Sequence, residues 1–154
     1  MFVRYFVDLD CPFDVIQAAL LGDPERWIPG MAITAEAHGE SLLAEVGFGE
    51  TLRVQKRVRI ELGTPIQLAE KLVLPIAWRS DPDPGFFPAL EGDLEAAPMG
   101  SRRSQLAMTA RYTPPFGLMG RAADRALFNR VAEATVRDFV DRVADALRRE
   151  LVPN

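Results

Sequence analysis

Hydrophobic residues recur at helical spacing through the last part of the chain, from Arg121 to Leu151. Neither proline nor glycine interrupts this stretch, and charged residues occupy the remaining positions. Apolar positions three and four residues apart share one face of an α-helix, which at 1.5 Å per residue would be roughly 46 Å long. A stripe of that length must be buried against a broad surface. Its members are Phe128, Val131, Thr135, Phe139, Val143 and Leu147.

Apolar and polar residues alternate through most of the preceding chain, as they do in half-buried strands. Residues 2–9 predict a first strand, residues 14–21 a short helix that ends at Gly22, and Asp23 a further short turn. The alternation then predicts six more strands, with a hairpin turn at Gly63–Thr64–Pro65. These strands are 31–37, 42–48, 51–62, 66–79, 86–96 and 102–112.

The alternation places one apolar row of each strand on a common face. An antiparallel sheet with one apolar and one charged face needs a cover, and the C-terminal helix is the one predicted element large enough. The predicted fold class is therefore α+β, with about seven antiparallel strands curled by their twist around a long C-terminal helix. No linker or repeat divides the chain, so residues 1–154 form one predicted domain. The inward residues include Ile66, Leu68, Leu72, Leu74, Ile76, Trp78, Leu90, Gly92, Leu94 and Met108.

Three local motifs add to this order of elements. They are Cys11-Pro12-Phe13-Asp14-Val15, Asp23-Pro24-Glu25-Arg26-Trp27, and the segment 114–120 before the long helix. Together they resemble the helix-grip fold of the START-like superfamily, also called the Bet v 1-like or polyketide cyclase/dehydrase and lipid transport superfamily (SRPBCC). The resemblance covers essentially the whole chain.

The resemblance implies an internal cavity between the curled sheet and the C-terminal helix, which typically holds a lipid, polyketide, sterol or other apolar ligand. Members of the superfamily are carriers, cyclases or aromatases, hydrolases, ligand sensors and partner-binding modules. The fold therefore does not select one function.

Two charged residues interrupt the predicted inward rows. Lys56 stands between Val54 and Val58, and Glu70 stands between Leu68 and Leu72. A hairpin turn at residues 63–65 would bring Lys56 and Glu70 opposite or diagonal to each other on the inner face. Buried charges are costly unless paired, so three interpretations remain open: a structural ion pair, a pair that orients the polar end of a ligand, or a β-bulge that turns one residue to solvent.

Thr135 is the polar member of the helix stripe, and its hydroxyl either bonds back to its own helix or points into a cavity. Gly92 lacks a side chain in mid-strand, which either widens a cavity or marks a bulge. The apolar residues on these rows would serve as cavity walls or as ordinary core. The candidate ligand-binding residues are Lys56, Glu70, Leu72, Leu74, Trp78, Leu90, Gly92, Met108, Phe128, Thr135 and Phe139.

Charge, cysteine content and the lack of long apolar runs argue against several classes of function. The net charge is −4, whereas nucleic-acid binding needs a basic surface. The single cysteine, Cys11, permits no intrachain disulfide and suits a reducing cytoplasm. The charged N-terminal segment lacks a signal-peptide pattern, and no apolar run approaches about 18 residues, so neither export nor a membrane span is expected.

Residues typical of catalytic and metal sites are few. His38 is the only histidine and falls in a predicted surface turn, which offers no oxyanion hole for a nearby serine. One histidine and one cysteine do not predict a transition-metal site, and the pattern Gly47-Phe48-Gly49 lacks the rest of a phosphate-binding loop. We therefore expect no cofactor and no metal.

The sequence thus predicts a cytoplasmic protein that binds a hydrophobic or amphipathic small molecule between sheet and helix. The first alternative is a cyclase- or aromatase-type enzyme in which Glu70 or Lys56 acts as acid or base. The second alternative is a protein-interaction module with a filled core and a partner surface near Phe116, Leu118 and Met119.

Overall fold

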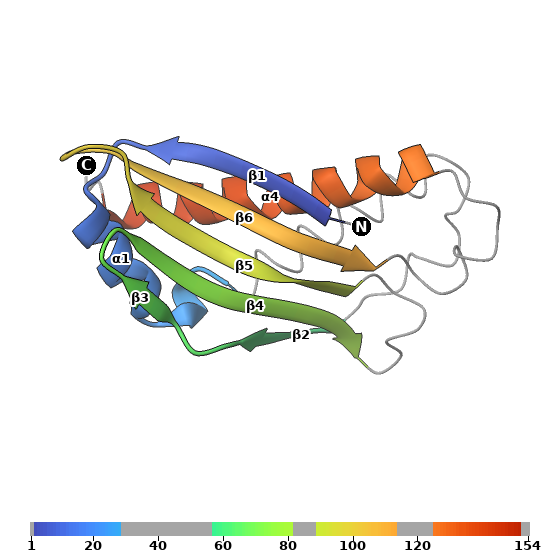
Figure 1. Cartoon of the computed structure of the whole chain (residues 1–154). Coiled ribbons are helices and arrows are strands. Elements are labelled where there is room, and N and C mark those ends of the chain that lie inside the picture. The colour runs from blue at the N-terminus through green and yellow to red at the C-terminus, as the bar shows by residue number, and fades with distance from the viewer. Residues whose placement is uncertain (1, 29–56, 82–88, 114–124, 152–154) are drawn as a thin grey trace.

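The computed structural model describes residues 2–28, 57–81, 89–113 and 125–151, and all structural statements below concern these ranges (Figure 1). The elements follow the predicted order of strand, short helices, strands and long helix. They are β1 (Phe2–Leu9), α1 (Phe13–Leu21), the 3₁₀ turn η1 (Pro24–Arg26), β2 (Arg57–Leu62), β3 (Ile66–Leu68), β4 (Lys71–Asp81), β5 (Ala89–Pro98), β6 (Ser104–Thr113) and α4 (Arg125–Leu151).

The described strands form one antiparallel sheet of six strands in the order β1-β6-β5-β4-β2, with β3 paired to β4. Figure 1 shows α4 lying along one face of this curved sheet, with α1 at the end where β1 stops. This arrangement confirms the predicted α+β helix-grip class. The predicted strands 31–37 and 42–48, and the first half of 51–62, lie outside the described residues.

The core lies between the sheet and α4, as the periodicities predict. In β5, Leu90 and Leu94 are almost fully buried, whereas Glu91 between them is exposed. On α4, Phe139 and Val143 are completely buried. The inward residues of the strands and the buried stripe of α4 therefore pack together in one apolar layer. Burial of that layer is the main stabilising term of the fold.

The predicted hairpin turn at Gly63–Pro65 is wrong. Both β2 and β3 pair with β4, and the turn that reverses the chain is at residues 69–70. Leu62 pairs with Ile76 and Ile66 pairs with Val73, so the β2–β3 side advances four residues while β4 advances three.

The extra residue between β2 and β3 is a bulge, which turns the following side chains to the other face of the sheet. Ile66 and Leu68, predicted to face inward, therefore lie on the outer face and are 49% and 55% exposed. The sequence pattern is strictly alternating on both sides of the bulge, so the pattern alone assigned both segments to one face.

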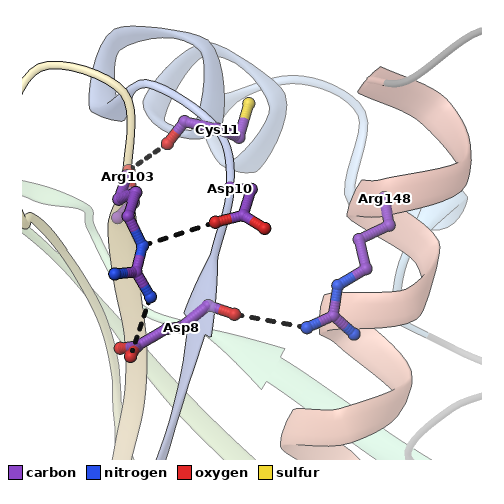
Figure 2. Close-up of polar contacts among 6 residues, drawn as sticks. Asp8, Asp10, Cys11, Arg103 and Arg148 are labelled. Atoms are coloured by element: carbon purple, nitrogen blue, oxygen red, sulfur yellow. Dashed lines mark hydrogen bonds and ion pairs between the residues drawn. The ribbon is translucent and has the colours of Figure 1, made fainter.

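The end of β1 is tied to both β6 and α4 (Figure 2). The Ser104 hydroxyl, at the start of β6, donates a hydrogen bond to the carbonyl oxygen of Cys11 at 2.7 Å. Arg103 forms ion pairs with Asp8 and Asp10 at 3.4 and 3.3 Å, and the Arg148 guanidinium on α4 donates to the Asp8 carbonyl at 3.2 Å. The ion pairs are largely exposed, and such pairs contribute little to stability, so the partly buried Ser104 bond is the strongest of these links.

We expect Ser104→Ala to lower the free energy of unfolding by about 1 kcal/mol, because the Cys11 carbonyl loses a partner, the fully buried Ser104 hydroxyl, in a partly buried site. Urea denaturation followed by far-UV circular dichroism measures the effect. Ser101→Ala is the matched control, since Ser101 is exposed in the preceding turn. Equal midpoints for the two variants would contradict a role for this hydrogen bond.

Candidate functional site

The candidate site is the inner face of the sheet together with the α4 residues that cover it. Residues that face one another across the strands form rungs, and these rungs differ in size. The rung nearest the end of β4 is bulky and includes two aromatic side chains. Its members are Ile60, Trp78, Leu90 and Tyr112.

The next rung has two small residues, Gly92 and Ala110, at its centre, and the two rungs that follow are apolar apart from the Tyr5 hydroxyl at the β1 edge. The second rung is Leu62, Ile76, Gly92, Ala110 and Val3. The third rung is Leu74, Leu94, Met108 and Tyr5, and the fourth is Leu72, Ala96, Leu106 and Val7. On the sheet face that packs against α4, side-chain size therefore falls at Gly92 and Ala110 and is larger again in the rungs on either side.

Trp78 is the central aromatic residue of this wall. Its side chain is 1% exposed, and its ring lies 5.0 Å from the ring of Phe139 on α4, tilted by 55°. Aromatic pairs favour such tilted arrangements at this distance. Within the described part of the chain, no hydrogen-bond acceptor is within reach of Trp78 Nε1. The indole thus has a packed apolar body and an unpaired polar hydrogen.

The predicted apolar wall residues occupy the expected inner positions. Leu72, Leu74, Leu90 and Met108 are at most 4% exposed on the sheet, and Thr135 and Phe139 are at most 1% exposed on α4. Whether any of them contacts a ligand stays a prediction. Lys56 and the side chain of Phe128 lie outside the described residues.

The predicted inward position of Glu70 is wrong. Glu70 is exposed in the turn between β3 and β4. The register that would bring Lys56 opposite Glu70 is not formed either, because β2 pairs with residues 76–81 of β4. The physical reason is the bulge at Gly63–Pro65, which the sequence pattern presents as a hairpin turn.

Gly92 serves a close approach of two strands. A Cβ atom at this position would lie 2.3 Å from the carbonyl oxygen of Thr109 and 2.7 Å from Cα of Ala110. The pairing of β5 with β6 continues through Gly92 without a bulge, so the predicted alternative that Gly92 marks a bulge is wrong. The missing side chain lets the backbone of β6 approach, and it does not by itself open space below the sheet.

A polar contact that the sequence did not reveal joins β1 to α4. The Tyr5 hydroxyl donates a hydrogen bond to Asp141 Oδ1 at 2.8 Å, and the Arg137 guanidinium lies 5.5 Å from the centre of the Tyr5 ring. Asp141 and Arg137 are four residues apart on the helix, a spacing at which opposite charges often pair with each other. Only the tertiary arrangement brings Tyr5 between them.

Asp141 changes the acidity of Tyr5. Partial burial raises the pKa of Tyr5 above its ordinary value of 10.0, and the hydrogen bond and negative charge of Asp141 raise this pKa further. The positive charge of Arg137 acts in the opposite direction. The bond therefore requires the protonated phenol, and this protonation state holds well beyond neutral pH.

A separate hollow of about 680 Å³ lies where the end of β1 meets the end of α4. Its apolar residues are Leu9, Ile16, Leu147 and Leu151, and Cys11 lies on its wall. Burial, and to a smaller extent the Asp14 carboxylate, raise the pKa of the Cys11 thiol. A thiol with a raised pKa is a poor nucleophile at neutral pH, so nothing in these surroundings activates Cys11.

Two further features of the described ranges bear on function. No helix within them is long and apolar enough to cross a membrane. No group of three or more histidine, cysteine or acidic residues there is arranged to hold a metal ion. His38 lies outside the described residues.

We expect Gly92→Ala to lower the free energy of unfolding by about 1–3 kcal/mol, the usual range for overpacking. The added methyl group would collide with backbone atoms of β6, which cannot move aside as a flexible side chain can. Thermal and urea unfolding measure the loss. An alanine variant as stable as the parent protein would show that β5 and β6 separate at no cost.

The Tyr5–Asp141 bond predicts a specific loss of stability in alkali. A folded-state pKa above 10.0 means that the folded protein holds this proton more tightly than the unfolded chain. The contribution is therefore complete below pH 10 and disappears as the pH rises through the higher folded-state pKa. We expect Tyr5→Phe to be less stable than the parent at neutral pH by about 1 kcal/mol, and this difference to shrink above pH 10.

Urea titrations from pH 7 to about pH 11 test this expectation. All other titratable groups, including Tyr112, are common to both proteins, so the difference between them isolates Tyr5. A difference that stays constant with pH would contradict the assignment.

Comparison with known proteins adds the fold and little more. No family model matches the chain, and no curated protein sequence matches it. A conserved protein from Geobacillus kaustophilus has a similar structure, with a TM-score of 0.58 and 14% identity over 97% of each chain. A hypothetical protein from Helicobacter pylori has a TM-score of 0.51 and 9% identity over 92% of this chain and 86% of its own.

The Zhui aromatase/cyclase from a Streptomyces species aligns over 99% of this chain and 96% of its own, with 14% identity and a TM-score of 0.47. At such identities the likeness concerns the fold alone. The Geobacillus and Helicobacter proteins share the arrangement of this chain over most of its length, in agreement with the α+β helix-grip fold that the order of strands and helices defines.

Proposed function

We propose that this protein binds a small amphipathic molecule between the curled sheet and α4, with an oxygen atom of the ligand accepting a hydrogen bond from Trp78. The observation that carries the proposal is the buried Trp78 indole N–H, for which the described residues provide no acceptor.

An unpaired buried donor is costly. Leaving such a group without a partner costs about 1–3 kcal/mol, and native proteins pair the large majority of their buried polar groups. A ligand with a carbonyl, ester, ether or hydroxyl oxygen at this depth would remove the cost. The indole would then fix the orientation of a molecule that is otherwise held by apolar contact.

The surroundings of Trp78 favour a mainly apolar ligand body. The neighbouring wall consists of Leu90, Phe139 and, two rungs along, Met108, all essentially inaccessible to water. Ligand pockets are typically lined in this way, by apolar and aromatic side chains with a few polar groups. Met108 is unbranched and polarizable, which suits ligands of varied shape. Fatty-acyl and polyketide-like compounds combine such a body with an acceptor oxygen.

Mass spectrometry tests the proposal directly. The gently purified full chain is analysed by native mass spectrometry, and an organic extract of the same sample is analysed beside it. A stoichiometric compound with an apolar body and at least one acceptor oxygen supports the proposal. A protein that is empty, and that also fails to take up hydrophobic fluorescent probes, has a filled core, and this result would remove the ligand hypothesis.

We expect Trp78→Phe to discriminate between two probes. A naphthyl ketone probe presents a carbonyl acceptor, whereas diphenylhexatriene is a pure hydrocarbon. Loss of the indole donor should weaken binding of the ketone about fivefold, as for one hydrogen bond, and should leave the hydrocarbon nearly unchanged. Fluorescence titration of both probes measures the two affinities.

Trp27→Phe is the matched control. Trp27 is also buried, and its Nε1 also lacks an acceptor among the described residues, but it follows η1 and does not stand on the sheet. This variant should bind both probes as the parent protein does. Equal weakening of both probes by Trp78→Phe would indicate loss of packing and would count against the hydrogen bond.

The cyclase alternative loses one of its two candidate residues, since Glu70 is exposed in a turn. Nothing in the described residues favours a particular reaction, so we assign no catalytic step. The alternative partner surface near Phe116, Leu118 and Met119 lies outside the described residues.

A further inference from the structure

The outer face of the sheet, opposite α4, carries a groove that the ligand site does not use. Its volume is about 500 Å³. One rung of facing residues crosses it from β2 to β1, through β4, β5 and β6. This rung consists of Glu61, Ala77, Glu91, Arg111 and Phe2.

Small side chains create the hollow. Ala77 stands between Glu61 and Glu91, so the rung dips at β4. On the adjoining rung, Pro75 and Thr109 flank Asp93. With strands about 4.8 Å apart, the carboxylate-bearing strands on either side of Ala77 are roughly 10 Å from each other, which leaves room for one side chain of another molecule.

The acidic side chains around this hollow lack cationic partners within the described ranges. Glu61, Glu91 and Asp93 form no ion pair there, although Glu95, the next acidic residue on the same row of β5, pairs with Lys71 at 2.9 Å. Arg111 faces Glu91 across the strands, but its guanidinium lies over the Phe2 ring, 5.0 Å from the centroid. Among the described residues that line the groove, three are acidic and Arg111 is the one cation, which is turned toward an aromatic ring. Arg4, which pairs with Thr109, is exposed at the β1 edge of the same face.

Apolar side chains flank the acidic middle. Phe2, at the β1 end of the groove, is 70% exposed and lines it. Phe6, Ile66 and Leu68 add exposed apolar surface on the same face of the sheet. An outer strand face that only meets water carries mainly polar residues, so this combination is typical of an interaction surface.

From this charge and apolar pattern we infer that the outer-face groove docks a segment of a partner protein, in which an arginine or lysine flanked by apolar residues enters the hollow above Ala77. The cation meets Glu61 and Glu91 from two sides, and a flanking apolar residue contacts Phe2. The guanidinium fork of an arginine matches two carboxylates better than a single ammonium group does.

Nuclear magnetic resonance titration of the isotope-labelled full chain tests this proposal. The probes are a short capped peptide with one arginine flanked by leucines, and the same peptide with citrulline, which is neutral and nearly isosteric. We expect the arginine peptide to produce saturable shifts in the backbone amide signals of Ala77, Glu91 and Thr109. The citrulline peptide should bind about fivefold more weakly, as expected for loss of an exposed ion pair.

Variants then assign the charges. Glu61→Gln and Glu91→Gln should each weaken the arginine peptide about fivefold, whereas Glu133→Gln, on an exposed position of α4, should have no effect. Each glutamine keeps the shape of the side chain, so the comparison does not depend on a change of fold.

Three results would overturn the inference. The first is equal binding of the arginine and citrulline peptides. The second is equal binding of spermidine, a polyamine without apolar groups, which would make the groove a site for small cations. The third is a concentration-dependent dimer in analytical ultracentrifugation with the same amide signals shifting on dilution, which would make a second copy the occupant.

Discussion

The apolar face of the sheet has to be covered by a single helix, and most other features of the structure follow from this requirement. α4 presents one buried stripe, with Phe139, Val143 and Leu147 essentially inaccessible to water. Burial of a large apolar side chain contributes about 1.5–3 kcal/mol, so the stripe fixes the position of the helix more firmly than any polar contact does. The sheet must curl to follow it, and a twisted sheet of six strands does so readily.

Polar links then form where the apolar layer ends. Tyr5 and Asp141 join the β1 edge to the middle of α4, and Ser104 joins β6 to the chain after β1. Each bond contributes modestly because folding exchanges it for bonds to water. These hydrogen bonds matter because they are directional. Apolar contacts alone would allow the elements to shift relative to one another, whereas hydrogen bonds of 2.8 and 2.7 Å hold one alignment.

Periodicity predicted those elements whose burial is uniform along their length. The bounds of β1 and α1 and the buried members of α4, such as Phe139, follow from local spacing because each element keeps one face inward throughout. The bulge after Leu62 was not predictable, since Gly63 and Pro65 are typical of a hairpin turn and the alternation resumes without a visible break. This single error moved Glu70 from the turn to the interior.

The candidate site was predictable in its apolar part and not in its polar part. Alternation alone places Trp78 and Met108 on the inner face, but the rungs that group Trp78 with Tyr112, and the lack of an acceptor for Trp78 Nε1, depend on pairings between strands far apart in sequence. The charged pattern of the outer face is likewise visible in the sequence as Glu91 and Asp93, while the hollow above Ala77 appears only when β2, β4 and β5 lie side by side.

The bulge between β2 and β3 has a consequence for how this chain can change over evolutionary time. The alternation that turns side chains inward or outward is shifted by one residue across the bulge. The number of residues in the segment 63–65 sets this shift. Loss of one codon there would leave Leu62 and Ile66 three residues apart, equal to the step from Ile76 to Val73 on β4, so the strand could continue without a bulge and Ile66 and Leu68 would still face outward. The outward assignment of β3 therefore tolerates a deletion at this point, whereas elsewhere in the sheet the loss of one residue would turn every following side chain to the other face.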